Sequence, residues 1–251
     1  MTAASRGRFF EVVRAEPVDL ALACLLIGCE VEPELDVDRA LTVLDALAAA
    51  VGPLGDDPAA ALQVALGGQA RFGGAAADYD DVRSSLLHEV LRRGRGLPIL
   101  LAVVWCEVAA RRGVRAVPLG LPGHVLVRIG ADTVVDPFNG GRRVPEAPLE
   151  PVLEPPALLL RVLTNIRALT ARQERSLETA RTRLWATELS LLLPHHPVAL
   201  RRERGELLVR LGDHVGGATE LEAYASLVEM ADEQEAETAR KQARSARARL
   251  N

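Results

Sequence analysis

His124 and Asp136 are the two residues whose types and spacing could support proton-transfer chemistry. Both lie in short apolar stretches that predict β-strands, and residues 130–132 between them suit a three-residue hairpin loop. In that register Ile129 faces Thr133. His124 and Asp136 then project from the same face as diagonal neighbours, roughly 5–8 Å apart at Cβ, where a carboxylate can orient an imidazole as in nucleophile–His–Asp triads. The alternative is that each side chain only makes hydrogen bonds within its own turn.

The element expected to stand behind this hairpin is a long helix. From Ile99 to Ala110 the only charged residue is Glu107, so the helix is apolar nearly all round and is predicted to be buried at the centre of the fold. It is expected to begin at Pro98 and to end at Gly113. Further helices are predicted over residues 18–27, 37–51 and 84–93, strands over 115–121, 124–129 and 133–138, and one short helix near 59–66.

The second part of the chain is predicted to be helical almost throughout. Residues 157–250 carry helical patterns that are interrupted at 194–197 and 212–217. Small and large residues at 205, 208, 211, 218 and 221 have the spacing of a tetratricopeptide-like helical hairpin. We therefore expect an α+β fold that is mainly α, with one domain over residues 1–150 and a tetratricopeptide-like helical domain over residues 151–251.

The composition argues against several functional classes. The net charge is −4, the basic residues are interspersed with acids, and no basic stripe with interleaved aromatic residues occurs, which argues against nucleic-acid binding. The apolar runs are too short to span a bilayer. Three cysteines, Cys24, Cys29 and Cys106, lie in apolar surroundings and form no disulfide framework. We expect a cytoplasmic protein with neither a nucleic-acid nor a membrane partner.

Three segments of the first part stand out: Gly96-Leu97-Pro98-Ile99, Leu121-Pro122-Gly123-His124-Val125 and Val135-Asp136-Pro137-Phe138-Asn139-Gly140-Gly141. In this order and spacing they resemble the SirB1 family of transglutaminase-like proteins. The resemblance extends to the N-terminal helices and to the helical part that follows. It implies a transglutaminase-like core, in which a central buried helix packs on a small antiparallel sheet, with tetratricopeptide-like helices after it.

The resemblance also implies where a nucleophile would lie, and that position holds Pro98. Active members of the wider superfamily carry a cysteine at the start of the central helix within Gly-x-Cys, and Gly96 matches the glycine. Leu100 stands where members of this family often have serine, whereas His124 and Asp136 match the other two triad positions. Proline and leucine have no lone pair that can attack an acyl carbon. We therefore expect neither cysteine transglutaminase nor thiol protease activity.

Other residues are weaker candidates for a nucleophile or a metal ligand. Cys106 lies about 12 Å further along the helix and is interpreted as a core thiol, and Ser84 and Ser85 as capping or packing residues. His195 and His196 have no third ligand in evidence, so no metal site is expected, and no cofactor is expected either. His88 and His214 are expected at the surface or in helix caps.

Tyr79, Asp81 and Asn139 are the candidate binding residues. Tyr79 and Asp81 precede the 84–93 helix in a stretch that resembles the family, and they could line a groove, with a structural turn as the alternative. Asn139 belongs to the motif that begins at Asp136.

Three functions follow from these residues. The first is a pseudoenzyme that binds a peptide or protein, through the former active-site groove or through the C-terminal helices. The second is an enzyme in which the His124–Asp136 pair performs acid/base catalysis without a covalent intermediate. Such an enzyme could belong to a biosynthetic pathway. The third is a structural role, in which the pair only holds the hairpin together.

Overall fold

The central helix of the fold is α6 (Pro98–Arg111), and it is buried as predicted. Ten of its fourteen residues are buried, from Pro98 to Trp105 without a break. Pro98 occupies the first turn after an extended Leu97, and Gly113, with a φ of +71°, follows the end of the helix. The computed structural model describes residues 3–145, 151–173 and 176–249, in two compact units, Met1–Val162 and Leu163–Asn251.

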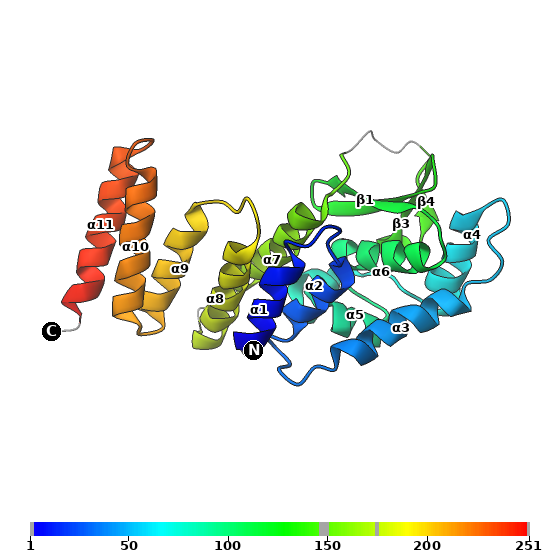
Figure 1. The fold of residues 1–251 in the computed structure, drawn as a ribbon, viewed down its shortest axis with the longest axis horizontal. Coiled ribbons are helices and arrows are strands. Elements are labelled where there is room, and N and C mark those ends of the chain that lie inside the picture. Colours follow the sequence, from blue (N-terminus) through cyan, green and yellow to red (C-terminus); the bar gives the residue numbers. More distant parts are fainter. Residues whose placement is uncertain (1–2, 146–150, 174–175, 250–251) are drawn as a thin grey trace. The chain divides into compact units, whose positions relative to one another are not determined.

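An antiparallel sheet of four strands packs on α6 through β1 and β2 (Figure 1). Its strands are β1 (Ala116–Leu121), β2 (His124–Ile129), β3 (Thr133–Asp136) and β4 (Arg142–Arg143), in the order β1-β2-β3-β4. Ile129 pairs with Thr133 and Val127 with Val135, so the predicted hairpin register is confirmed. The predicted strand over 133–138 was too long, because the chain turns into a 3-10 helix at Pro137–Asn139.

The first unit also contains the helices α1 (Ala3–Val12), α2 (Leu20–Gly28), α3 (Val37–Ala50) and α5 (Leu87–Arg93) (Figure 1). Seven of the nine residues of α2 are buried, and α2 packs against α3, α5 and α6. Aspartates cap α2 and α3, since Asp19 accepts from Leu22 N and Asp36 from Arg39 N. The predicted helix over 84–93 is wrong at its start, because residues 82–85 form a separate 3-10 turn.

The segment between α3 and α5 is built from short turns. It contains α4 (Pro58–Leu62), the π-helical η1 (Gln63–Gln69) and the 3-10 turns η2 (Ala76–Asp80) and η3 (Val82–Ser85). The segment is tied to the end of β3, because Gly74 N donates to Phe138 O at 2.9 Å. A Cβ on Gly74 would lie 1.9 Å from Cε2 of Phe138, so this approach requires glycine.

Helix α7 (Pro155–Arg172) begins in the first unit and ends in the second. The second unit continues with α8 (Leu177–Leu192), α9 (Ala199–Arg210), α10 (His214–Val228) and α11 (Glu233–Ala248), and each of these helices packs against the next (Figure 1). A Cβ on Gly205 of α9 would lie 2.8 Å from Leu221 Cγ of α10, which accounts for the small residue in the predicted hairpin. The predicted break at 212–217 was too wide, because α10 begins at His214.

The architecture is therefore mainly α with a small antiparallel sheet, as the sequence predicts. Within the described ranges, no helix is both long enough and apolar enough to cross a membrane.

Candidate functional site

His124 opens β2 directly after a turn in which Gly123 has a φ of +71°. Its Nε2 lies 3.0 Å from Oδ2 of Asp136, at the end of the neighbouring strand β3. The side chains of His124 and Asp136 are 26% and 13% exposed, so the pair is half-buried and solvent reaches it. The structure thus brings together the two residues predicted to form a catalytic-type pair. Because Nε2 faces the carboxylate, Nδ1 is the ring nitrogen left to exchange a proton with another group.

The Asp136 carboxylate is held by its own turn. Oδ1 accepts from Phe138 N at 3.0 Å and from Asn139 N at 3.4 Å, which caps the 3-10 helix. Oδ2 accepts from Nδ2 of Asn139 at 2.7 Å. Asn139, a predicted binding residue, therefore orients the carboxylate that faces His124.

Two aromatic rings lie beside the pair. The Phe138 ring meets the His124 imidazole edge-on, with ring centroids 5.9 Å apart, and the Tyr79 ring lies at the same centroid distance from Phe138. Tyr79 Oη lies 3.4 Å from Gly123 O. Burial raises the pKa of Tyr79, and the negative charge of Asp136 raises it further. Tyr79 thus lies at the site, with 39% of its surface exposed. We call His124, Asp136, Tyr79 and Phe138 the His124 surface.

Arg161 of α7 supports this surface, and the sequence did not indicate it. Its Nη2 donates to Leu121 O at 2.5 Å and to His124 O at 2.9 Å, so it ties together both ends of the β1–β2 turn. Burial lowers the pKa of Arg161. Its partners are backbone carbonyls, which leave no pattern of residue types to detect.

The position at which the resemblance places the nucleophile is apolar and buried. Pro98 is buried in the first turn of α6, with Ile99 and Leu100 at 1% and 0% exposed. Cys106 lies further along the same helix, and burial, followed by the charge of Glu107, raises the pKa of its thiol well above the ordinary value. A thiol in such surroundings stays protonated and is a poor nucleophile.

Ser84 is engaged in a buried network. Its Oγ donates to Oδ1 of Asp78 at 2.8 Å, and both residues are fully buried. Arg93 and Arg95 also donate to Asp78 Oδ1, at 3.3 and 3.0 Å, and Ala75 N donates to Oδ2 at 2.8 Å. Ser84 therefore holds the segment that carries Tyr79.

Asp81, the other predicted binding residue, forms ion pairs with arginines. Its carboxylate lies 3.0 Å from Arg83 Nε and 3.1 Å from Arg93 Nη1. These ion pairs tie the turn before α5 to the end of α5, whereas Tyr79 and Asn139 contact the pair or its aromatic neighbour.

One histidine outside the site differs from what the sequence suggested. The expectation that His88 lies at the surface is wrong, because it is 4% exposed and packs where α5 meets α2. His196 Nδ1 contacts Leu193 O at 2.8 Å. Among the residues that the structure describes, one group has the composition and spacing of metal ligands: Glu32, His88 and Glu89.

The first unit thus has the central buried helix on a small antiparallel sheet that the resemblance implied. Residues 38–177, more than half of the chain, match the transglutaminase-like superfamily. The chain belongs to this superfamily. Residues 166–251 match the tetratricopeptide repeat, a repeat whose stacked helix pairs form extended surfaces.

Several curated proteins resemble parts of the chain. A "UPF0162 protein" of Xylella fastidiosa is 36% identical over 174 residues, which cover 60% of this chain and 60% of the relative. A "UPF0162 protein" of Pseudomonas aeruginosa is 37% identical over 143 residues, 55% of this chain and 53% of the relative. "F-box only protein 21" of Mus musculus is 34% identical over 68 residues, 27% of this chain and 11% of the relative. The chain thus spans 60% or less of the length of these relatives, and no solved structure matches it.

Proposed function

We propose that this chain is a SirB1-type transglutaminase-like protein without a cysteine nucleophile, and that it binds a peptide or protein segment at the His124 surface instead of cleaving or cross-linking it. The C-terminal tetratricopeptide-like helices would provide a second contact surface for the same partner or for another one.

The observation that carries this proposal is the contrast between the start of α6 and the His124 surface. At the start of α6, Pro98 and Leu100 are buried hydrocarbon, so acyl transfer through a covalent intermediate has no attacking atom there. The His124–Asp136 pair has a 3.0 Å contact and is partly exposed. A site that keeps the orienting pair without a nucleophile can still recognise a substrate-like segment.

The side chains around the pair suit a peptide. Tyr79 is 39% exposed and Phe138 is partly exposed, and aromatic rings beside a few polar groups are typical of the centre of binding interfaces. His124 offers Nδ1 for a hydrogen bond, because its Nε2 faces Asp136. An extended segment could therefore combine aromatic contact with hydrogen bonding.

Selection of peptides from a displayed library on the full chain would test this proposal. The affinity of the selected peptides is then measured for Tyr79→Ala and His124→Ala, each of which should weaken binding by roughly tenfold or more, as expected for residues at the centre of an interface. Val43→Ala, at an exposed residue of α3 in the first unit, is the control and should leave affinity unchanged. Peptides that bind both site variants as well as the wild type would refute a binding site at this surface.

The pair also favours a second candidate function, non-covalent acid/base catalysis, as in an enzyme of a biosynthetic pathway. Asp136 holds Nε2 of His124, which leaves Nδ1 to accept or deliver a proton on a substrate that needs no protein nucleophile. In that case cells with His124→Ala or Asp136→Asn should behave like cells that lack the protein, even where partner binding is retained. Wild-type behaviour of the cells with either variant would exclude this function.

A further inference from the structure

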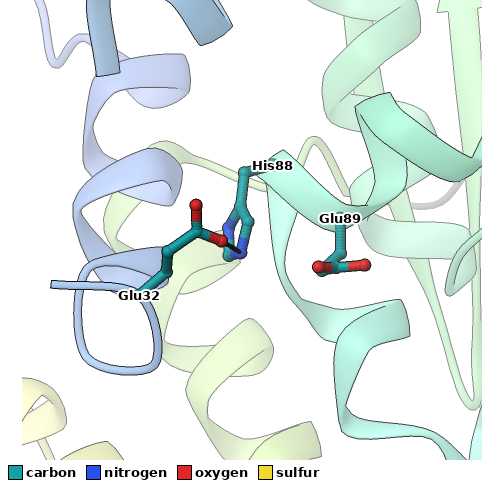
Figure 2. Close-up of side chains that lie close together, drawn as sticks. All are labelled: Glu32, His88 and Glu89. Carbon is teal, nitrogen blue, oxygen red and sulfur yellow. Dashed lines mark ion pairs between the residues drawn. The ribbon is translucent and has the colours of Figure 1, made fainter. Parts of the chain in front are cut away.

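Three potential metal ligands from two helical segments meet on the first unit. Glu32 follows α2, and His88 and Glu89 lie in the first turn of α5 (Figure 2). One ligand atom of each residue lies within 4.8 Å of those of the other two. Figure 2 shows the His88 ring flanked by the two carboxylates. The set of one imidazole and two carboxylates is one that zinc accepts in proteins.

His88 is the residue that sets this group apart from a surface cluster of acids. It is only 4% exposed, and its Nδ1 has no hydrogen-bond partner in the described part of the chain. Its Nε2 lies 3.7 Å from Oε2 of Glu32, too far for a hydrogen bond. A buried imidazole whose nitrogens lack good partners is costly unless it serves a further purpose.

Packing fixes the His88 ring in this position. A Cβ on Gly28 would lie 2.3 Å from Nδ1 and 2.7 Å from Cε1, so the ring fits only because residue 28 is glycine.

The guanidinium of Arg92 lies between the carboxylates of Glu32 and Glu89, where a metal ion would bind. Nη2 of Arg92 lies 2.7 Å from Oε2 of Glu32 and 2.7 Å from Oε1 of Glu89. The Arg92 side chain is 54% exposed, and it borders a cavity of about 510 Å³ that Glu32 and His88 also line. The cavity gives Arg92 room to swing away and gives an ion room for water ligands.

We propose that Glu32, His88 and Glu89 bind one divalent transition-metal ion of the zinc class, which displaces the guanidinium of Arg92. Two carboxylates balance the charge of the ion, and the imidazole selects against calcium and magnesium, which prefer oxygen ligands. The ligand atoms must move inward to reach roughly 2.1 Å from zinc, and Glu32, with 41% of its side chain exposed, is free to do so.

The affinity should be modest. Histidine ligands of tight sites donate their other ring N–H to an acceptor, and Nδ1 of His88 has none among the described residues. Arg92 also competes for the same carboxylates. We expect a dissociation constant on the order of micromolar. The site is independent of the His124 surface, so its failure would leave the proposed function unaffected.

Isothermal titration calorimetry of the full chain, with zinc chloride as the only titrant, tests the site. Wild-type chain should bind one ion, and His88→Gln and Glu89→Gln should each weaken binding by roughly tenfold or more. Arg92→Gln should tighten binding, because it removes the competing cation, and this sign distinguishes a metal site from an ion-pair cluster. His195→Gln, at an exposed histidine, is the control for non-specific imidazole binding.

Two further measurements make the outcome decisive. Circular dichroism of each metal-free variant checks folding, and if His88→Gln does not fold, Glu89→Gln carries the test. With Co²⁺ in place of zinc, the spectrum should lack a thiolate charge-transfer band, which excludes binding by the three cysteines. The proposal is overturned if wild-type chain shows no saturable binding, if the folded ligand variants bind as wild type does, or if Arg92→Gln binds more weakly.

Discussion

Replacement of Asp78 by asparagine should destabilise the first unit by about 3 kcal/mol. The Asp78 carboxylate is fully buried and accepts four hydrogen bonds, from Ser84, Arg93, Arg95 and the backbone of Ala75. The amide of asparagine cannot balance the two guanidinium charges, and its NH2 group cannot accept from the backbone N–H. The segment that loses its anchor carries Tyr79.

The magnitude follows from burial. Removal of one partner of a buried ion pair costs about 3–5 kcal/mol. The Arg93 and Arg95 side chains are 19% and 48% exposed, so water can hydrate the orphaned charges in part, which lowers the expected cost to about 2–4 kcal/mol. For a chain of this size, a loss of 3 kcal/mol corresponds to a decrease in Tm of roughly 6–12 °C.

The loss should depend on pH with a definite sign. Burial alone would raise the pKa of Asp78, but hydrogen bonds from Ser84 and Arg95 outweigh it and leave the pKa below the ordinary value of 3.8. A carboxyl whose folded pKa is lowered stabilises the fold above its unfolded pKa, and this contribution is lost as the pH falls through the folded value. The difference between wild type and Asp78→Asn should therefore be constant near neutral pH and shrink below about pH 4.

Urea unfolding followed by tryptophan fluorescence measures this difference. Trp105 lies in the first unit and Trp185 in the second, so a Trp185→Phe background isolates the first. Asp80→Asn is the matched control, because Asp80 is exposed, and it should change stability by about 0.5 kcal/mol or less. If Asp78→Asn and Asp80→Asn have the same effect, the buried network does not stabilise the unit as argued here.

Three more outcomes follow. Gly141→Ala should lower the free energy of unfolding by about 2–4 kcal/mol, because φ is +80° there and a Cβ would lie 2.1 Å from Cη2 of Trp105. Gly130→Ala, where φ is +67° and the space is open, should cost only about 1–2 kcal/mol in the same thermal unfolding assay. Arg161→Met removes two hydrogen bonds to carbonyls of the β1–β2 turn and should cost about 1–3 kcal/mol by the same assay; a neutral result would contradict its anchoring role. Because the pKa of Cys106 is raised, iodoacetamide near pH 8 should alkylate it at least about tenfold more slowly than free cysteine, and denaturant should abolish the difference. Rapid alkylation of the native protein at Cys106 would contradict this.

The approach of His124 to Asp136 could be predicted because it depends on local rules. A three-residue loop fixes which residues pair, and the alternation of side chains along strands then places both on one face. The buried central helix was predictable for a similar reason, since Ile99 to Ala110 leave no polar face for solvent. The error at Phe138 has a local cause, because Asp136 turns its carboxylate back onto the chain and begins a 3-10 helix.

The features that escaped prediction depend on long-range packing. Arg161 binds carbonyl oxygens far away in the sequence, and Glu32 meets His88 only because α2 packs against α5. No spacing along the chain reports either contact. One helix start could have been found, since Ser176 caps the helix that follows it.

The central claim is that the site holds an orienting His–Asp pair and no nucleophile. The most direct test is to incubate the full chain with glutamine-containing acyl-donor peptides, quench with acid and measure the intact mass. Pro98→Cys, which places a thiol at the start of α6, is measured beside the wild type. The wild-type mass should stay unchanged with every donor. A trapped acyl adduct on any side chain of the wild-type protein would contradict the account.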